Sequence, residues 1–238
     1  MSEPMKIIAV VAQKGGTGES TVTANLAVAA QLAGRKTLIA DADPQGSIVE
    51  WGRARQSKTP LVVPVKASAI HPTRYAVERS GLDLMFIDTR CSALEDSLEA
   101  AKAAHLTLIV VRPTAVDLRA IAKTVEDLKP LGRPTAFVIN QAPSQRVGRE
   151  PLIVAEAIDL LIGYGLPVAP VGLRNRLVYQ AAFAHGLGVQ EVDPLSRAAE
   201  EIGALWSYVD ARLPALETPE RRRAAPVPMF QALEMRAN

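Results

Sequence analysis

Short apolar runs alternate along the chain with longer segments whose apolar residues recur at the helical spacing. The apolar runs predict seven strands, at 7–12, 37–41, 61–65, 84–88, 106–111, 135–139 and 168–171. Most of these runs are continuously apolar rather than alternating with polar residues. That pattern is typical of strands buried on both faces of a parallel sheet.

The helical spacing predicts helices between these strands. The expected ranges are 20–33, 93–104, 117–131, 151–162, 177–185 and 194–213, with Gly34 as a C-cap and Asp117 as an N-cap. A strand–helix alternation of this length predicts an α/β fold with a doubly wound, mostly parallel sheet. Its crossovers should be right-handed and its helices should cover both faces.

The pattern changes after residue 213. Residues 1–213 are long enough to form one large domain, and we expect 214–238 to be a flexible C-terminal tail. The tail contains three consecutive arginines, at 221–223. Its last stretch, 229–235, could form one or two helical turns against a partner.

Composition narrows the possible function classes. Cys91 is the single cysteine, so no disulfide can form within the chain. A formal net charge of +2 is too small to indicate nucleic-acid binding, which must be judged from local clusters instead. The sequence shows no signal peptide, and no apolar stretch reaches the roughly 20 residues of a membrane span. We therefore expect a soluble cytoplasmic protein with no membrane partner.

The strongest chemical signal is a glycine-rich segment after the first predicted strand, where residues 13–21 read QKGGTGEST. Glycines let backbone N–H groups close around phosphate oxygens, and the start of the following helix adds positive potential. An ordinary glycine-rich turn is the alternative, but the strand–loop–helix context and the Ser-Thr pair favour a phosphate loop. The candidate nucleotide-binding residues are Gly15, Gly16, Thr17, Gly18, Glu19, Ser20 and Thr21, with Ser20 also placed to bind Mg²⁺.

This segment resembles the deviant Walker A box of the ParA/MinD family, whose pattern is K-G-G-x-G-K-[ST]-[ST]. The resemblance implies ATP and Mg²⁺ as cofactors. Lys14 matches the family's signature lysine, which reaches across a nucleotide sandwich dimer to the partner's phosphates.

The resemblance continues at three later positions. Residues 41–47 (DADPQGS) look like the family's second acidic box, in which Asp43 would orient the attacking water. Residues 86–89 (FIDT) look like Walker B, with Asp88 holding Mg²⁺. Asn140 stands where the family hydrogen-bonds adenine. An aspartate at a strand end can also simply cap a turn, but two at the same edge of a doubly wound sheet favour function.

Trp51 and residues 176–179 (RLVY) make the chain most like the short plasmid-partition ParA proteins, which lack an N-terminal DNA-reading domain. In that family an ATP-bound homodimer binds DNA without sequence preference, and a ParB-like or cargo adaptor protein stimulates hydrolysis. The resemblance therefore implies a nucleoid-associated switch for DNA partition or cargo positioning. The candidate DNA-binding residues are Arg149, Arg174 and Arg176, although nearby acidic residues could balance these charges.

Two sites depart from the family pattern. Glu19 replaces the phosphate-binding lysine, and Arg90 with Cys91 replaces a small pair after Walker B. A carboxylate about 4 Å from a phosphate charge is repelled by roughly 4 kcal/mol at an effective dielectric near 20. The chain could be an engineered inactive variant or a natural pseudo-ATPase, or Arg90 could supply the missing charge. Lys14 and Arg90 are the cations that could meet Glu19.

Other functions stay open. The main alternative is a non-hydrolysing pseudo-ATPase that binds DNA or a conjugation or secretion partner. A metabolic P-loop enzyme is a further alternative. One cysteine argues against an iron–sulfur reductase, which would need two in each subunit.

Overall fold

The sheet is parallel throughout, as the apolar runs predicted. The computed structural model describes residues 5–91, 93–145 and 149–213. Within them the strand order is β3-β2-β4-β1-β5-β6, and every neighbouring pair is parallel. The strands are β1 (Lys6–Val11), β2 (Thr37–Asp41), β3 (Leu61–Pro64), β4 (Leu84–Asp88), β5 (Leu106–Val111) and β6 (Thr135–Ile139).

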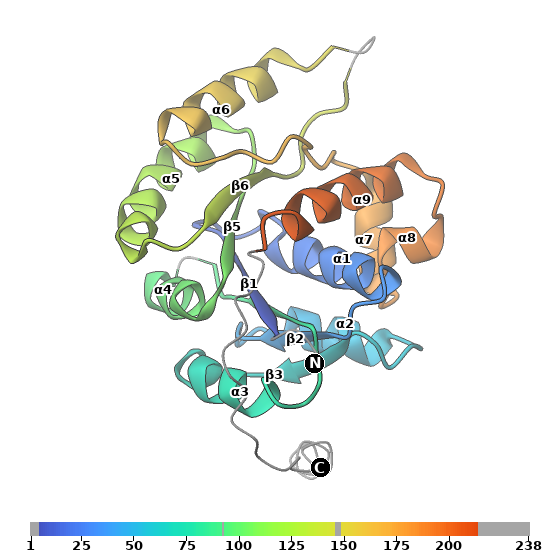
Figure 1. Ribbon diagram of the computed structural model, residues 1–238. Coiled ribbons are helices and arrows are strands. Elements are labelled where there is room, and N and C mark those ends of the chain that lie inside the picture. Colours follow the sequence, from blue (N-terminus) through green and yellow to red (C-terminus); the bar gives the residue numbers. More distant parts are fainter. Residues whose placement is uncertain (1–4, 92, 146–148, 214–238) are drawn as a thin grey trace.

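Helices cover both faces of the sheet (Figure 1). On one face lie α1 (Glu19–Leu32), α2 (Ser47–Ala54), α7 (Leu177–Ala184), α8 (Val189–Val192) and α9 (Arg197–Asp210). On the other lie α3 (Ile70–Val77), α4 (Leu94–Ala103), α5 (Ala115–Leu128) and α6 (Leu152–Gly163). Successive residues of β1 enter opposite cores, which explains why its sequence is continuously apolar.

Helix α1 is buried on nearly all sides. It lies on the sheet and is covered by α7, α8 and α9, so residues Val22 to Ala30 are buried. Gly34 follows the helix with φ 85°, and the Arg35 N–H donates to the Ala30 carbonyl at 3.0 Å. This is the expected glycine C-cap. A helix held this firmly fixes the position of its own N-terminus, where the glycine-rich segment ends.

The predicted strand at 168–171 is wrong. This segment follows the outer edge of β6, where the Ala169 N–H donates to the Phe137 carbonyl at 2.8 Å, but it forms only an isolated bridge at Val168. Pro170 has no N–H to continue a ladder, which explains why no strand is assigned.

Other elements differ in detail. The helix expected at 194–213 begins at Arg197, with Ser196 as its N-cap. Helices α2, α3 and α8 were not predicted. The N-cap of α5 is Thr114, whose hydroxyl accepts from the Asp117 N–H at 3.3 Å. Asp117 therefore lies in the first turn rather than at the cap. The predicted tail at 214–238 lies outside the described residues.

The turn after α7 ties three of the covering helices together. The Arg55 guanidinium, just past α2, donates to the Gly186 carbonyl at 2.7 Å and to both carboxylate oxygens of Glu191 at 2.8 and 2.6 Å. Gly186 has φ 69°, and a Cβ there would lie 2.5 Å from the Arg55 backbone nitrogen. The close approach therefore requires glycine.

Gly186→Ala should destabilise the fold by about 2–4 kcal/mol, because it adds a backbone clash to an unfavourable positive φ. Gly34→Ala is the matched control, since its φ is 85° but its Cβ would meet nothing within 4 Å. Gly34→Ala should lower the free energy of unfolding by only about 1 kcal/mol. Urea unfolding monitored by circular dichroism measures both, and equal losses would contradict the clash.

Candidate functional site

The glycine-rich segment forms a loop between β1 and α1 at the carboxyl edge of the sheet. Gly16 and Gly18 have φ of 79° and 89°, which side chains with a Cβ rarely adopt. Gly18 is the N-cap of α1, so the loop ends where the free N–H groups of a 14-residue helix point out. This backbone fits the predicted phosphate cradle.

Two side chains directly after β6 hold the loop in place. The Asn140 amide donates to the Thr17 carbonyl at 2.6 Å, and the Gln141 amide donates to the Gly16 carbonyl at 2.8 Å. A Cβ on Gly18 would lie 2.4 Å from the Asn140 amide nitrogen. In this structure Asn140, the predicted adenine contact, binds the loop itself.

Asp88 joins the end of β4 to α1. It is fully buried and accepts hydrogen bonds from the Ser20 hydroxyl at 2.7 Å and the Thr23 hydroxyl at 2.9 Å. Burial raises the pKa of Asp88 to about 7, and the charges of Asp41 and Asp43 add to the rise. A hydroxyl beside a carboxylate is an oxygen pair that suits Mg²⁺, which keeps most of its other ligands as water or phosphate. The two predicted metal ligands therefore lie together.

No self-sufficient metal centre accompanies this pair. Within residues 5–91, 93–145 and 149–213, no group of three or more His, Cys, Asp or Glu side chains could hold an ion. A bound Mg²⁺ would therefore depend on oxygens from a phosphate ligand as well as from the protein.

The two aspartates of the second acidic box have different surroundings. Asp41 is buried and accepts from the Asp43 N–H at 3.1 Å and from the Val49 N–H at 2.9 Å, so it anchors the turn into α2. Burial raises its pKa. Asp43 is only half-buried and accepts from the Gln45 N–H at 2.9 Å. Asp41 therefore has a structural role, and Asp43 is the more accessible carboxylate.

Glu19 is buried at the start of α1, with 7% of its surface exposed. Burial, together with the negative charge of Asp88, raises its pKa to about 9, while a backbone hydrogen bond at Ala12 opposes the shift. Its Oε2 atom has no hydrogen-bond partner among the described residues. At neutral pH this side chain is therefore mostly a protonated, neutral acid.

Neither candidate cation pairs with Glu19. The Lys14 ammonium lies 3.6 Å from the Asp117 carboxylate, and the Arg90 guanidinium lies 3.1 Å from Asp96. Cys91 lies beside the loop, with its sulfur 3.4 Å from where a Cβ on Gly15 would be. The charge that a lysine would bring to the phosphate loop is thus not replaced by either predicted neighbour.

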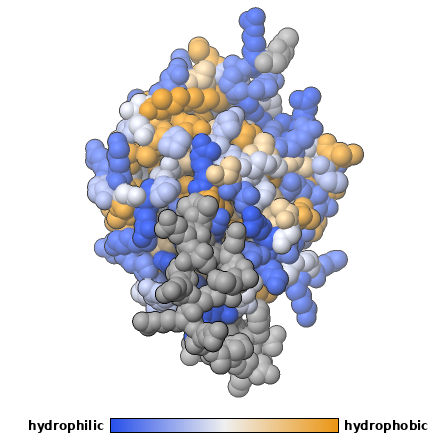
Figure 2. Space-filling view, viewed as in Figure 1, coloured by the Kyte–Doolittle hydropathy of each residue, from blue (hydrophilic) through white to orange (hydrophobic). Residues whose placement is uncertain are grey.

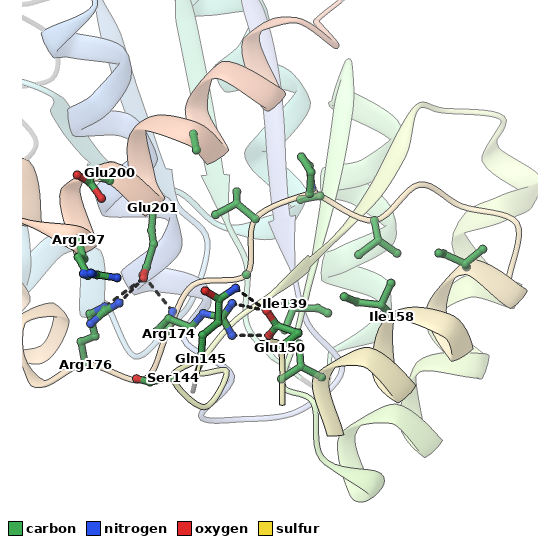
Figure 3. Close-up of a pocket in the computed structure, with 18 residues that line it drawn as sticks. Ile139, Ser144, Gln145, Glu150, Ile158, Arg174, Arg176, Arg197, Glu200 and Glu201 are labelled. Carbon is green, nitrogen blue, oxygen red and sulfur yellow. Dashed lines mark hydrogen bonds and ion pairs between the residues drawn. The ribbon is translucent and has the colours of Figure 1, made fainter. Parts of the chain in front are cut away.

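Two of the candidate DNA-binding arginines, Arg174 and Arg176, lie beyond β6. They line a cavity of about 700 Å³ together with α6, residues 168–172 and α9 (Figure 3). Arg174 is 10% exposed and binds both oxygens of Glu150 at 2.5 and 2.7 Å. Arg176 donates to Glu201 at 2.6 Å. Arg149 is exposed. Acidic neighbours therefore balance the charges of Arg174 and Arg176, which the sequence analysis gave as the alternative to DNA binding.

Apolar side chains also reach the surface nearby. Along α6, Leu152, Ile153, Leu160 and Ile162 are all more than two-fifths exposed. Figure 2 shows hydrophobic residues at the surface in the region of this helix.

Several contact residues were missed by sequence reasoning. They are Gln13, Arg112, Asp117, Thr124 and Gln141. Gln141 has a positive φ of 52°. Gln13 and Gln141 stand directly beside the predicted Lys14 and Asn140, which was the sequence signal available for them. The Thr124 contact with Gln13 depends on packing between distant segments.

Residues 8–176 match the family described as the CobQ/CobB/MinD/ParA nucleotide binding domain. The chain belongs to this family.

Similar family members include proteins that position different cargoes. Over 219 residues the chain is 27% identical to the maintenance of carboxysome distribution protein A of Halothiobacillus neapolitanus. The aligned region covers 85% of this chain and 95% of that protein. The chain is 31% identical over 100 residues to the chromosome partitioning protein ParA of Caulobacter vibrioides. That aligned region covers 41% of this chain and 38% of that protein.

The fold matches the septum site-determining protein MinD of Pyrococcus horikoshii OT3, solved with Mg-ADP. The TM-score is 0.68 at 22% identity, over 87% of this chain and 96% of that one. This confirms the predicted P-loop fold. The family model is that of a nucleotide binding domain.

One structural finding bears on membranes. Among the helices of the described ranges, none has both the length and the apolar character of a membrane span.

Glu19 should make the stability of this ParA/MinD-family chain depend on pH. The unfolded side chain loses its proton near pH 4.5, whereas the folded one keeps it to about pH 9. The folded state binds more protons in this window, so stability falls as pH rises through it. Glu19→Gln should remove that loss and stabilise the protein by about 1–3 kcal/mol at pH 8.5, with little effect at pH 4.5.

Urea unfolding across this pH range, in EDTA and without nucleotide, measures the effect. Glu95→Gln, on the exposed side of α4, is the control and should leave the pH dependence unchanged. Parallel curves for the parent and Glu19→Gln would show that Glu19 is not a buried protonated acid.

Proposed function

We propose that this chain is a ParA-type switch for plasmid or chromosome partition, or for positioning another cargo, whose phosphate loop is impaired by Glu19. In this proposal Mg-ATP joins two copies, the dimer binds DNA without sequence preference, and a ParB-like or cargo adaptor triggers release. Its place would be the cytoplasm, on the nucleoid. Family membership supports the proposal, together with relatives named for carboxysome distribution and for chromosome partitioning.

The observation that carries the proposal is the Ser20–Asp88 pair at the start of α1. The two side chains are 2.7 Å apart, directly beside a glycine loop that ends at a helix N-terminus. Backbone N–H groups and the helix dipole would bind phosphate, and the paired oxygens would bind Mg²⁺. The half-buried Asp43 would orient water, and Lys14 would reach a partner's phosphates.

The defect follows from what replaces the lysine. A lysine about 4 Å from a phosphate charge contributes roughly 4 kcal/mol of attraction at an effective dielectric near 20. Because the buried Glu19 is largely neutral, it adds less repulsion than an ionised carboxylate would, but it supplies no attraction. ATP affinity should therefore fall by orders of magnitude without a rearranged fold.

A second candidate is a non-hydrolysing pseudo-ATPase that binds DNA or a conjugation or secretion partner in one state. Glu19 favours this alternative, because a buried acid with a raised pKa stands in the loop and brings no positive charge to a phosphate. The two candidates differ in whether restoring the lysine restores nucleotide binding.

Glu19→Lys should raise Mg-ATP affinity at least about tenfold, or about 1.4 kcal/mol, and should produce ATP-dependent dimers. Calorimetric titration and analytical ultracentrifugation measure the two effects. Glu19→Gln is the matched control. It removes the acid without adding a cation, so its Mg-ATP affinity should rise much less. If the parent already binds in the micromolar range and hydrolyses ATP as fast as Glu19→Lys, the proposed defect is wrong. If Glu19→Lys does not bind ATP, the pseudo-ATPase is supported.

The Glu19→Lys protein with Mg-ATP should bind duplex DNA of any sequence, with affinity that falls steeply as salt rises. Arg149→Ala should weaken binding to all DNA sequences alike. It should also reduce the slope of log affinity against log salt concentration by about one. Replacing Arg174 and Arg176 together should also weaken binding, although it leaves Glu150 and Glu201 unpaired. Arg133→Ala is the control. Arg133 is exposed just before β6, at the amino ends of the strands, whereas the candidate arginines follow the carboxyl end of β6. Fluorescence anisotropy measures binding, and salt-independent or sequence-selective binding would count against the proposal.

A further inference from the structure

An open groove lies between α6 and α9, beside the edge of the sheet. It contains the cavity of about 700 Å³, whose lining includes residues 168–172 (Figure 3). On the α6 side the lining is apolar, with Val154, Ile158 and Ile162 spaced four residues apart on one face of the helix. Ile162 is also 56% exposed, so the apolar lining continues onto the open surface. The groove therefore offers apolar surface to another segment.

The sheet edge inside the groove does not suit an added strand. The Ala169 N–H already donates to the Phe137 carbonyl at 2.8 Å, and Pro170 has no N–H to offer. A proline at a sheet edge is one of the features that block strand addition. The occupant should therefore bind through its side chains, as an amphipathic helix does when it lies in an apolar groove.

The two helices that border the groove are acidic. Helix α6 contains two acidic residues and no basic one, and α9 contains three acidic residues and one arginine, Arg197. Glu156, Asp159 and Glu200 are exposed, and none of the three forms an ion pair with another described residue. An apolar groove with acidic rims favours an apolar helix that carries basic residues.

The chain itself contains a segment with these properties, outside the described residues. Residues 229–235 read MFQALEM, and helical spacing would place Met229, Phe230 and Leu233 on one face. Residues 221–238 contain four arginines and one acidic residue. The segment thus combines an apolar face with positive charge.

The connection to this segment is long enough to reach the groove. Helix α9 has 14 residues, so the end that lines the cavity lies about 20 Å from the end that leads into the tail. The 15 residues at 214–228 precede the segment, and an extended chain of that length spans about 50 Å. Residues 229–235 can therefore fold back along α9.

We propose that residues 229–235 form an amphipathic helix that docks in the groove between α6 and α9 of the same chain, with Phe230 and Leu233 against the apolar side of α6. The docked helix would cover the cavity that Arg174 and Arg176 line, and it would compete with any other ligand for this surface. The contact is separate from the phosphate loop, so its test needs no nucleotide.

The experiment measures how fast a cysteine in the tail forms a disulfide with a cysteine in the groove. Cys91→Ser removes the single cysteine, and Ala204→Cys with Ala232→Cys then places one thiol in the cavity lining and one in the tail. Ala211→Cys with Ala232→Cys is the matched control, because Ala211 is exposed after α9, outside the cavity lining and closer to the tail. Loop closure alone would favour the control pair slightly, so docking should make the Ala204→Cys pair react about fivefold faster or more under a mild oxidant.

Variants on each side of the contact test its specificity. Phe230→Ser with Leu233→Ser alters only the tail and should lower the rate of the Ala204→Cys pair to that of the control. Ile162→Asp in the groove should do the same. Leu152→Asp, on the same helix but outside the cavity lining, should leave the rate unchanged.

Three results would overturn the proposal. One is an equal rate for the two cysteine pairs, and another is a fast Ala204→Cys pair that survives Phe230→Ser with Leu233→Ser. The third is a disulfide that forms mainly between chains, which non-reducing gels distinguish from one within a chain. That result would show that the tail docks on a second copy instead.

Discussion

The buried Asp88 carboxylate is the interaction on which the site depends. It accepts hydrogen bonds from Ser20 and Thr23, so it fixes the first turns of α1 to the end of β4. Helices α7, α8 and α9 bury α1 from the other side, and this leaves the helix no freedom to shift along the sheet. The glycine loop, which must connect β1 to that fixed N-terminus, is then held by Asn140 and Gln141. Contacts within the protein therefore hold the cradle, which lowers the ordering cost of binding a ligand.

Buried acidic groups gather at the same edge of the sheet. Burial raises the pKa values of Glu19, Asp41 and Asp88, and their mutual repulsion adds to the rise. A phosphate loop usually offsets such carboxylates with a lysine and with Mg²⁺, but here the lysine position is itself acidic. Proton uptake is then the simplest way for the empty site to reduce its charge, because an ionised carboxylate in this environment would be desolvated and unpaired.

Sequence pattern predicted the sheet well, because continuous apolar runs report burial on both faces and need no knowledge of partners. It failed at 168–171, where an apolar run with Pro170 lies along an edge without forming a ladder. It also placed Asp117 as a helix cap. Local spacing could not decide between Thr114 and Asp117 as the cap, nor show that Lys14 and Arg112 converge on the Asp117 carboxylate. The P-loop motif gave the residues of the loop, but their contacts with α5 and β6 depend on segments about 100 or more residues away in the chain.

The positions of the two cations decide how the Glu19 change should be understood. Had Lys14 or Arg90 been paired with Glu19, the site would have been reorganised around the acid, and restoring a lysine would leave a displaced cation behind. Instead Lys14 is held by Asp117 and Arg90 by Asp96, each outside the cradle, and Glu19 Oε2 is left without a partner. The hydrogen bonds of Glu19 with the Ala12 backbone and the Thr17 side chain only partly offset the cost of its burial. Around Glu19 the loop keeps its positive-φ glycines and its hydrogen bonds to Asn140 and Gln141.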